Sequence, residues 1–158
     1  MINCEAFINN AIEFCLKSLK GYSDTNEIVN CLTTHNSLLH SRFRYSIARD
    51  IAKLLFSIYP DHVKAVKLYG STMEYTAGVF SDIDIVIHVN HFSNEMHDTI
   101  KTLNLELSEK YFILIGKAPE EWSYFIDIHV INSDPSQKAL SSRAYLEYIL
   151  HNESIEIS

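Results

Sequence analysis

Four short apolar runs in the second part of the chain, separated by polar stretches, constrain the fold most. Each run has the length and the β-branched or aromatic content of a β-strand. They cover residues 63–69, 83–89, 111–115 and 124–131. Strands that alternate with helical stretches favour an α/β (α+β) fold, with a small mixed β-sheet and helices mainly on one face.

Helical periodicity accounts for most of the rest of the chain. Before the first run, apolar residues recur at three- and four-residue steps, and Pro60 ends the last of these stretches. Ser93 is a suitable N-cap for a further helix. The helices predicted in this way cover about residues 7–19, 27–32, 41–59, 94–108 and 141–150, the last followed by a short extended tail.

The length of 158 residues, with 47% hydrophobic residues, suits one compact domain and is too short for two ordinary ones. We therefore expect a single domain over residues 1–158. Residues 1–60 would form its N-terminal helical part, and residues 61–158 its catalytic sheet and covering helices.

Charge and hydropathy indicate which classes of binding partner the chain can have. The chain has 13 Lys and Arg against 20 Asp and Glu, a formal net charge of -7, so a nucleic-acid partner is disfavoured. The amino end lacks the basic and apolar segments of a leader peptide. No segment reaches the roughly 18 consecutive apolar residues of a membrane span. We expect a cytoplasmic protein with no membrane partner.

Cysteine and histidine residues show no metal-ligand spacing. Cys4, Cys15 and Cys31 lack the paired spacing of a zinc site and are expected to be reduced core residues. The histidines at 88, 91 and 97 fall across a strand end and a loop.

Residues 68–89, LYGSTMEYTAGVFSDIDIVIHV, carry the most informative pattern. Gly70 and Ser71 form a turn after one strand, and Asp82 and Asp84 begin the next. Alternate residues of a strand point to the same face, so these two carboxylates lie together, roughly 6 to 7 Å apart along the strand. Taken alone, the glycine–serine pair is an ordinary turn and the two acids could be a solvated strand end.

A third carboxylate, Asp127, is the only acid within the apolar run YFIDIHVI. An acid in such a strand needs a cation, a hydrogen-bond partner or solvent. Strands lie about 4.8 Å apart, so neighbouring strands would bring Asp127 to Asp82 and Asp84. Such a group of hard oxygen ligands suits Mg²⁺. His129 shares the face of Asp127, either as a substrate-orienting group or as a simple neighbour.

The spacing Leu68-Tyr69-Gly70-Ser71, ten residues, then Asp82-Ile83-Asp84-Ile85 resembles the hG[GS]-x(9–13)-Dh[DE]h motif of the DNA polymerase β-like nucleotidyltransferase superfamily. Asp127 stands where that superfamily has its third carboxylate. The resemblance covers about residues 40–158 and is closest to the minimal nucleotidyltransferases and the small antibiotic adenylyltransferases. It implies the nucleotidyltransferase fold.

The resemblance also implies residue roles. Gly70 and Ser71 would bind the phosphates of ATP or another nucleoside triphosphate. Asp82 and Asp84 would hold two Mg²⁺ ions, and Asp127 one of them. Many minimal members have Arg-Gly shortly after the serine, whereas Met73, Glu74 and Tyr75 occupy this region here. Phosphate contacts would then come from another basic residue, with Lys117 and Lys67 as candidates.

The leading functional hypothesis is a transferase that moves a nucleoside monophosphate, AMP from ATP by resemblance, to a hydroxyl of an unidentified small molecule or protein. One alternative is an antitoxin-like protein that binds or adenylylates a helical HEPN-type toxin. Another is an inactive nucleotide-binding domain. A second copy of the chain could close the cleft, as a homodimer. Trp122, Tyr124 and Phe125 could stack on a base, although such residues are more often core.

Overall fold

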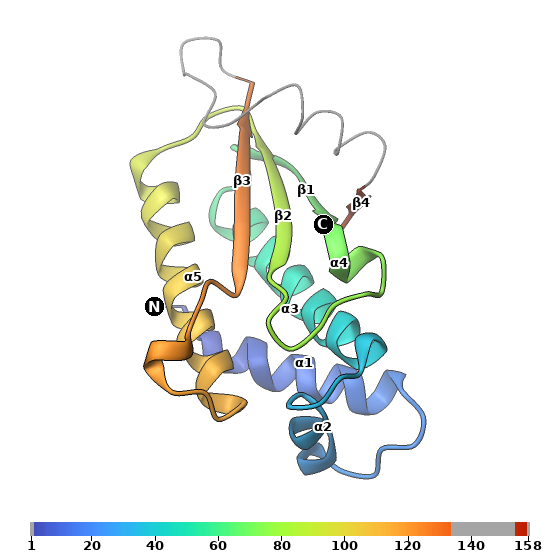
Figure 1. Cartoon of the computed structure of the whole chain (residues 1–158). Helices are drawn as coiled ribbons and strands as arrows, with labels where there is room; N and C mark the ends of the chain where they lie inside the picture. The colour runs from blue at the N-terminus through green and yellow to red at the C-terminus, as the bar shows by residue number, and fades with distance from the viewer. Residues whose placement is uncertain (1, 134–153, 158) are drawn as a thin grey trace.

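The fold is described from a computed structural model, which describes residues 2–133 and 154–157. Its centre is a four-stranded mixed sheet in the order β3-β2-β1-β4 (Figure 1). Strand β1 is antiparallel to β2 and to β4, and β2 is parallel to β3. The strands cover Val63–Tyr69 (β1), Ile83–Val89 (β2), Ile126–Asn132 (β3) and Ile155–Glu156 (β4).

Helices cover one face of this sheet, which we call the back face. They are α1 (Cys4–Ser18), α2 (Thr25–Cys31), α3 (Ser37–Ile58), the single turn α4 (Gly70–Met73) and α5 (Asn94–Leu114), with a 3₁₀ turn η1 (Pro119–Glu121). Helices α3 and α5 pack against the strands, and α1 packs across α3 and α5 (Figure 1). The expected mixed sheet with helices mainly on one face is therefore confirmed.

One continuous hydrophobic core joins the helices to the back face of the sheet. The residues of β2 at 83, 85, 87 and 89 are buried in it together with Phe43 and Ile47 of α3. The opposite face, which we call the front face, carries Tyr69, Asp84 and Asp127 in one row across β1, β2 and β3. The alternation of strand side chains thus places the acids opposite the helices.

The predictions for β1 and β2 match the structure at both ends. The predicted strand 124–131 begins two residues later, at Ile126, and the predicted tail contains β4. Helix α3 begins at Ser37, four residues before its predicted start, because Asn36 caps it by accepting a hydrogen bond from the Leu39 amide. The helix predicted over 141–150 lies outside the described residues.

The strand predicted over 111–115 is wrong, because these residues form the last turns of α5. Within this run Tyr111, Phe112 and Ile115 are buried, whereas Ile113 is 59% exposed. The burial continues the four-residue spacing of the preceding turns of α5, and periodicity alone does not separate a five-residue apolar run in a helix from a strand.

Gly116 follows the end of α5 and caps it. Its φ is +73°, its amide donates to the Ile113 carbonyl, and the Lys117 amide donates to the Phe112 carbonyl. These two bonds form a Schellman motif, in which glycine is favoured because it adopts the left-handed conformation without steric cost. The helix predicted over 94–108 therefore continues for six more residues.

None of the helices in the described part of the chain has the length and apolar character needed to cross a bilayer.

Candidate active site

Three aspartates meet on the front face of the sheet. Asp84 of β2 pairs in register with Asp127 of the parallel strand β3, and Asp82 lies two residues before Asp84. One carboxylate oxygen from each residue lies within 4.8 Å of the others, and all three side chains are partly buried. The structure therefore brings together the three acids that strand alternation predicts to converge.

The local sequence explains why these carboxylates cannot turn away from one another. Ile83 and Ile85, which flank Asp84, are fully buried in the core on the back face. A shift of one residue in the register would bury the acids and expose the isoleucines. Hydrophobic burial on one face of β2 thus fixes the carboxylates on the other.

The crowding changes the proton affinity of the central acid. Burial, together with the negative charges of Asp82 and Asp127, raises the pKa of Asp84 to about 7, while His129 opposes the shift. Burial disfavours a charged carboxylate, and so do like charges close by. Without a cation, the cluster is therefore protonated in part near neutral pH.

Gly70 makes room for this cluster. Its φ is +71°, and a Cβ atom at this position would overlap the Oδ2 atom of Asp84. The residue expected to allow close approach of phosphate thus also allows the approach of a carboxylate. Ser71 is partly exposed and lies next to it in α4, a helix of only four residues.

His129 lies beside the cluster on β3. Its Nε2 atom is 3.0 Å from Oδ2 of Asp127, and its ring centroid is 6.5 Å from that of Tyr69. The shared face predicted for His129 and Asp127 is therefore observed as a direct hydrogen bond. This bond orients the Asp127 carboxylate toward the other two acids.

A buried arginine holds the loop that leads into Asp82. Arg44 of α3 is fully buried; its Nε donates to the Ser81 carbonyl, and its Nη2 donates to the Val79 carbonyl and to the Tyr111 hydroxyl. The Tyr111 hydroxyl donates to the same Val79 carbonyl. The fork of guanidinium donors therefore fixes two carbonyls directly before the first acid of the cluster.

The surroundings of Arg44 compensate for its burial. Its Cζ atom lies 5.1 Å from the ring centroids of Tyr111 and Phe125, which stack on each other. Burial lowers the pKa of Arg44, and Tyr111 and Asp82 oppose this shift.

His40 completes the set of partners around Arg44. Burial lowers the pKa of His40 to about 4, so the ring is neutral at pH 7. A neutral ring with the proton on Nε2 donates to the Thr34 carbonyl at 2.8 Å and leaves Nδ1 to accept from Nη1 of Arg44 at 3.1 Å. This tautomer satisfies both ring nitrogens.

Sequence analysis did not identify Arg44, His40 and Tyr111. The available indication was the position of Arg44 itself, which lies on the buried stripe of α3 with Ile47, Ala48 and Ile51. A charged residue on the apolar face of an amphipathic helix requires dedicated partners.

The other candidate residues for phosphate binding and base stacking lie in different surroundings. Lys67 lies on β1 beside Val86, on the front face one row from the acids, whereas Nζ of Lys117 lies 5.2 Å from the Phe80 ring centroid. Phe125 is a core residue and Tyr124 is 69% exposed. The indole of Trp122 donates to the Lys117 carbonyl. The aromatic residues of this segment therefore do not form one stacking surface.

The expectations for cysteine are confirmed in part. All three cysteines are free, and Cys4 and Cys15 are buried whereas Cys31 is partly buried. Within residues 2–133 and 154–157, the three aspartates form the group of side chains close enough to share an ion, and no histidine belongs to it.

The donor set fits Mg²⁺. Hard divalent cations take oxygen ligands, and one or two carboxylates together with substrate phosphates are a common magnesium site. Three carboxylates lie within 4.8 Å, and burial together with the neighbouring acids raises the pKa of Asp84, so a cation would be favourable here. Asp82, Asp84 and Asp127 are the residues that would hold the ion.

Comparison with known families decides the class of the protein. A family profile described as a nucleotidyltransferase domain matches residues 48–153. The chain belongs to this nucleotidyltransferase family. The match spans β1, α4, β2, α5 and β3, and thus every residue of the acidic cluster. No curated protein and no solved structure matches the chain significantly.

Family membership supports nucleotidyl transfer as the general chemistry of this nucleotidyltransferase. Members usually use a nucleoside triphosphate and a divalent metal ion, and the acidic cluster has the ligands for such an ion. The resemblance read from the glycine–serine turn and the two following acids is thereby confirmed at the level of the family.

We predict that Arg44→Lys lowers the free energy of unfolding by about 2–4 kcal/mol, because lysine keeps the charge but leaves buried carbonyls without donors. Urea unfolding measures this. Hydrogen exchange at the amides of residues 79–82 should also become faster. Arg49→Lys is the matched control on α3, with an expected change below about 0.5 kcal/mol. Stability of Arg44→Lys within that range would contradict the role of Arg44.

We also predict that Asp84→Asn stabilises the protein in the presence of chelator, by an amount that increases with pH. The folded chain holds a proton on Asp84 up to about pH 7, whereas the ordinary pKa of an aspartate carboxyl group is 3.8. The parent therefore loses stability as the pH rises through this range, and asparagine does not titrate. Relative to the parent, the melting temperature of Asp84→Asn should rise between pH 5 and pH 8.

The control for this comparison is Asp98→Asn on α5, where the side chain is 78% exposed. The difference in melting temperature between Asp98→Asn and the parent should not rise between pH 5 and pH 8. A melting temperature of Asp84→Asn well below that of the parent at pH 8 would show that Asp84 is a structural acid with essential hydrogen bonds.

Proposed function

We propose that the chain is a Mg²⁺-dependent nucleotidyltransferase that transfers AMP from ATP to a hydroxyl of a small molecule or a protein. The observation that carries this proposal is the meeting of Asp82, Asp84 and Asp127 within 4.8 Å, inside the segment that matches the family. An acidic cluster of this density repels a triphosphate unless cations lie between them.

In this proposal the acceptor hydroxyl gives up its proton to solvent, and its oxygen forms a bond to the α-phosphorus of ATP. The bond from that phosphorus to the bridging oxygen breaks, and pyrophosphate leaves. Bound Mg²⁺ would lower the pKa of the attacking hydroxyl and neutralise charge on the leaving pyrophosphate. Asp82 and Asp84 would supply carboxylates to both ions, and Asp127 to one. Gly70 keeps the turn close to Asp84, and Ser71 is placed to donate hydrogen bonds to phosphate oxygens.

Two further residues support the geometry of the cluster. The hydrogen bond from His129 holds one oxygen of Asp127, so that the other remains for a cation. Arg44 holds the loop before Asp82 through its carbonyls. Rigid support of this kind matters because small displacements of metal ligands lower the rate of phosphoryl transfer.

A cleft of about 310 Å³ beside Asp127 is the site we propose for the acceptor. It lies between β3 and α5 and is lined by polar groups of both elements, including His129, Lys101 and Asn104. A hydroxyl compound in this cleft would lie beside one acid of the cluster. Apolar side chains such as Ile100 and Val130 line the cleft beside these polar groups, and this mixed lining favours an acceptor that combines hydrogen-bonding groups with an apolar part.

The test combines binding with transfer. Isothermal titration calorimetry should show ATP affinity at least tenfold higher with Mg²⁺ than with excess chelator, since about 1.4 kcal/mol corresponds to a factor of ten. ATP labelled in the α-phosphate should transfer label to an acceptor from a panel of polar hydroxyl compounds and proteins, with equal release of pyrophosphate.

Asp84→Asn is the matched variant for the transfer assay, because it keeps the size of the side chain and removes the charge that places the ions. It should lose label transfer while its fold is retained. Equal ATP affinity with Mg²⁺ and with chelator, or full transfer by Asp84→Asn, would contradict the proposed function.

A further inference from the structure

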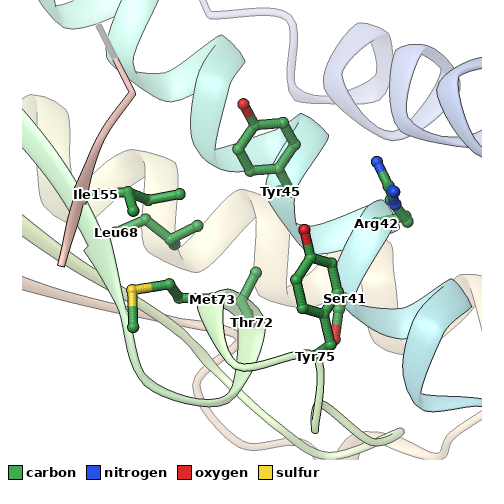
Figure 2. Close-up of a pocket in the computed structure, with 8 residues that line it drawn as sticks. All are labelled: Ser41, Arg42, Tyr45, Leu68, Thr72, Met73, Tyr75 and Ile155. Atoms are coloured by element: carbon green, nitrogen blue, oxygen red, sulfur yellow. The ribbon is translucent and has the colours of Figure 1, made fainter. Parts of the chain in front are cut away.

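A second cavity, of about 180 Å³, lies behind the glycine–serine turn and away from the acidic cluster. It lies between α3, β1, α4 and β4. Its apolar lining comes from Leu68, Met73 and Ile155, and its polar lining from Ser41, Arg42 and Thr72. In Figure 2 the aliphatic side chains lie on the left, Arg42 lies on the right, and the rings of Tyr45 and Tyr75 lie between them.

The cavity faces the opposite side of the sheet from the proposed catalytic residues. Leu68 is a buried back-face residue of β1, and its register partner in β4 is Ile155. The next residue, Tyr69, lies on the front face in register with Asp84. The two sites therefore lie on different sides of the same turn, and the cavity requires no assumption about nucleotide transfer.

Two orphaned polar atoms belong to residues that line this cavity. Within the part of the chain that the structure describes, two buried side-chain nitrogen or oxygen atoms have no hydrogen-bond partner, Nε of Arg42 and Oγ1 of Thr72. Thr72 is only 3% exposed. Since nearly all buried polar groups are hydrogen-bonded, two exceptions at one cavity indicate a ligand that supplies acceptors.

The charge at the cavity is positive and comes from Arg42. Among the described residues, no Asp or Glu forms an ion pair with Arg42, whose Cζ lies 5.8 Å from the centroid of the Tyr75 ring. The hydroxyl of Ser41 accepts a hydrogen bond from the Ala77 amide, which leaves its proton to donate. Arg42, Thr72 and Ser41 therefore offer three donors to an anionic group.

The backbone at the mouth of the cavity is strained. Tyr75 has φ of 60°, the one positive value outside glycine among the described residues, and its side chain is 55% exposed. A bulky residue in the left-handed region is unusual and persists where the surrounding structure requires it, often at ligand sites. This conformation places the aromatic ring over the Arg42 guanidinium.

We propose that this cavity binds a small aromatic carboxylate with a single ring. The volume of about 180 Å³ is close to that of engineered cavities of roughly 150 Å³ that take benzene. The aliphatic side chains and the two tyrosine rings would contact the ring of the ligand. The carboxylate would accept hydrogen bonds from Arg42 and Thr72, which satisfies both orphaned atoms.

The experiment uses benzoate as the probe and the full chain as the protein. Benzoate should raise the melting temperature and perturb the NMR resonances of residues 41–45 and 72–75. Toluene, which matches the ring but lacks the carboxylate, should bind at least tenfold more weakly. Arg42→Met should weaken benzoate at least tenfold. Lys53→Met on the same helix, where the lysine side chain is 63% exposed and does not line the cavity, should leave the affinity within twofold of the parent.

Thr72→Val keeps the shape of the side chain and removes the orphaned hydroxyl. It should raise the melting temperature of the ligand-free protein, because an unsatisfied buried group is lost, and weaken benzoate at least threefold. This variant also tests the proposal should Arg42→Met fail to fold. No binding of benzoate by the parent at 10 mM, undiminished binding by Thr72→Val, or a lower melting temperature of ligand-free Thr72→Val would overturn the proposal.

Discussion

Repulsion among three carboxylates is the constraint around which this fold is organised. At a separation of 4.8 Å and an effective dielectric constant of about 20, each pair of charges costs about 3 kcal/mol. Three features keep the acids together despite this repulsion. They are the burial of isoleucine on the back face of β2, the parallel register of β2 with β3, and the absence of a side chain at Gly70. Packing on the back face of the sheet thus holds the cluster in place, and a divalent cation on the front face would neutralise its charge.

The support behind the cluster depends on one buried cation. Arg44 links α3 to α5 through Tyr111 and to the loop before Asp82 through the carbonyls of Val79 and Ser81. Its charge is offset in part by Asp82 and by two aromatic faces. Arg44 therefore adds hydrogen bonds between the N-terminal helical part and the loop before Asp82 to the hydrophobic core that the two parts share.

Sequence reasoning succeeded where hydrophobic periodicity and spacing act locally. The ends of β1 and β2, the convergence of Asp82, Asp84 and Asp127, and the family itself follow from alternation and from one motif. It failed over residues 111–115, where an apolar run suits a strand and a helix equally and tertiary packing decides. Sequence reasoning also could not identify the partners of Arg44, because Val79 and Tyr111 lie 35 and 67 residues away from it along the chain.

The central claim, that the three aspartates together hold divalent ions, is tested most directly by electron paramagnetic resonance of Mn²⁺, which can replace Mg²⁺ at sites with oxygen ligands. The account predicts that the parent binds Mn²⁺ and that Asp84→Asn and Asp127→Asn each weaken this binding at least tenfold, whereas Asp98→Asn does not. Unchanged Mn²⁺ affinity in both cluster variants would contradict the account.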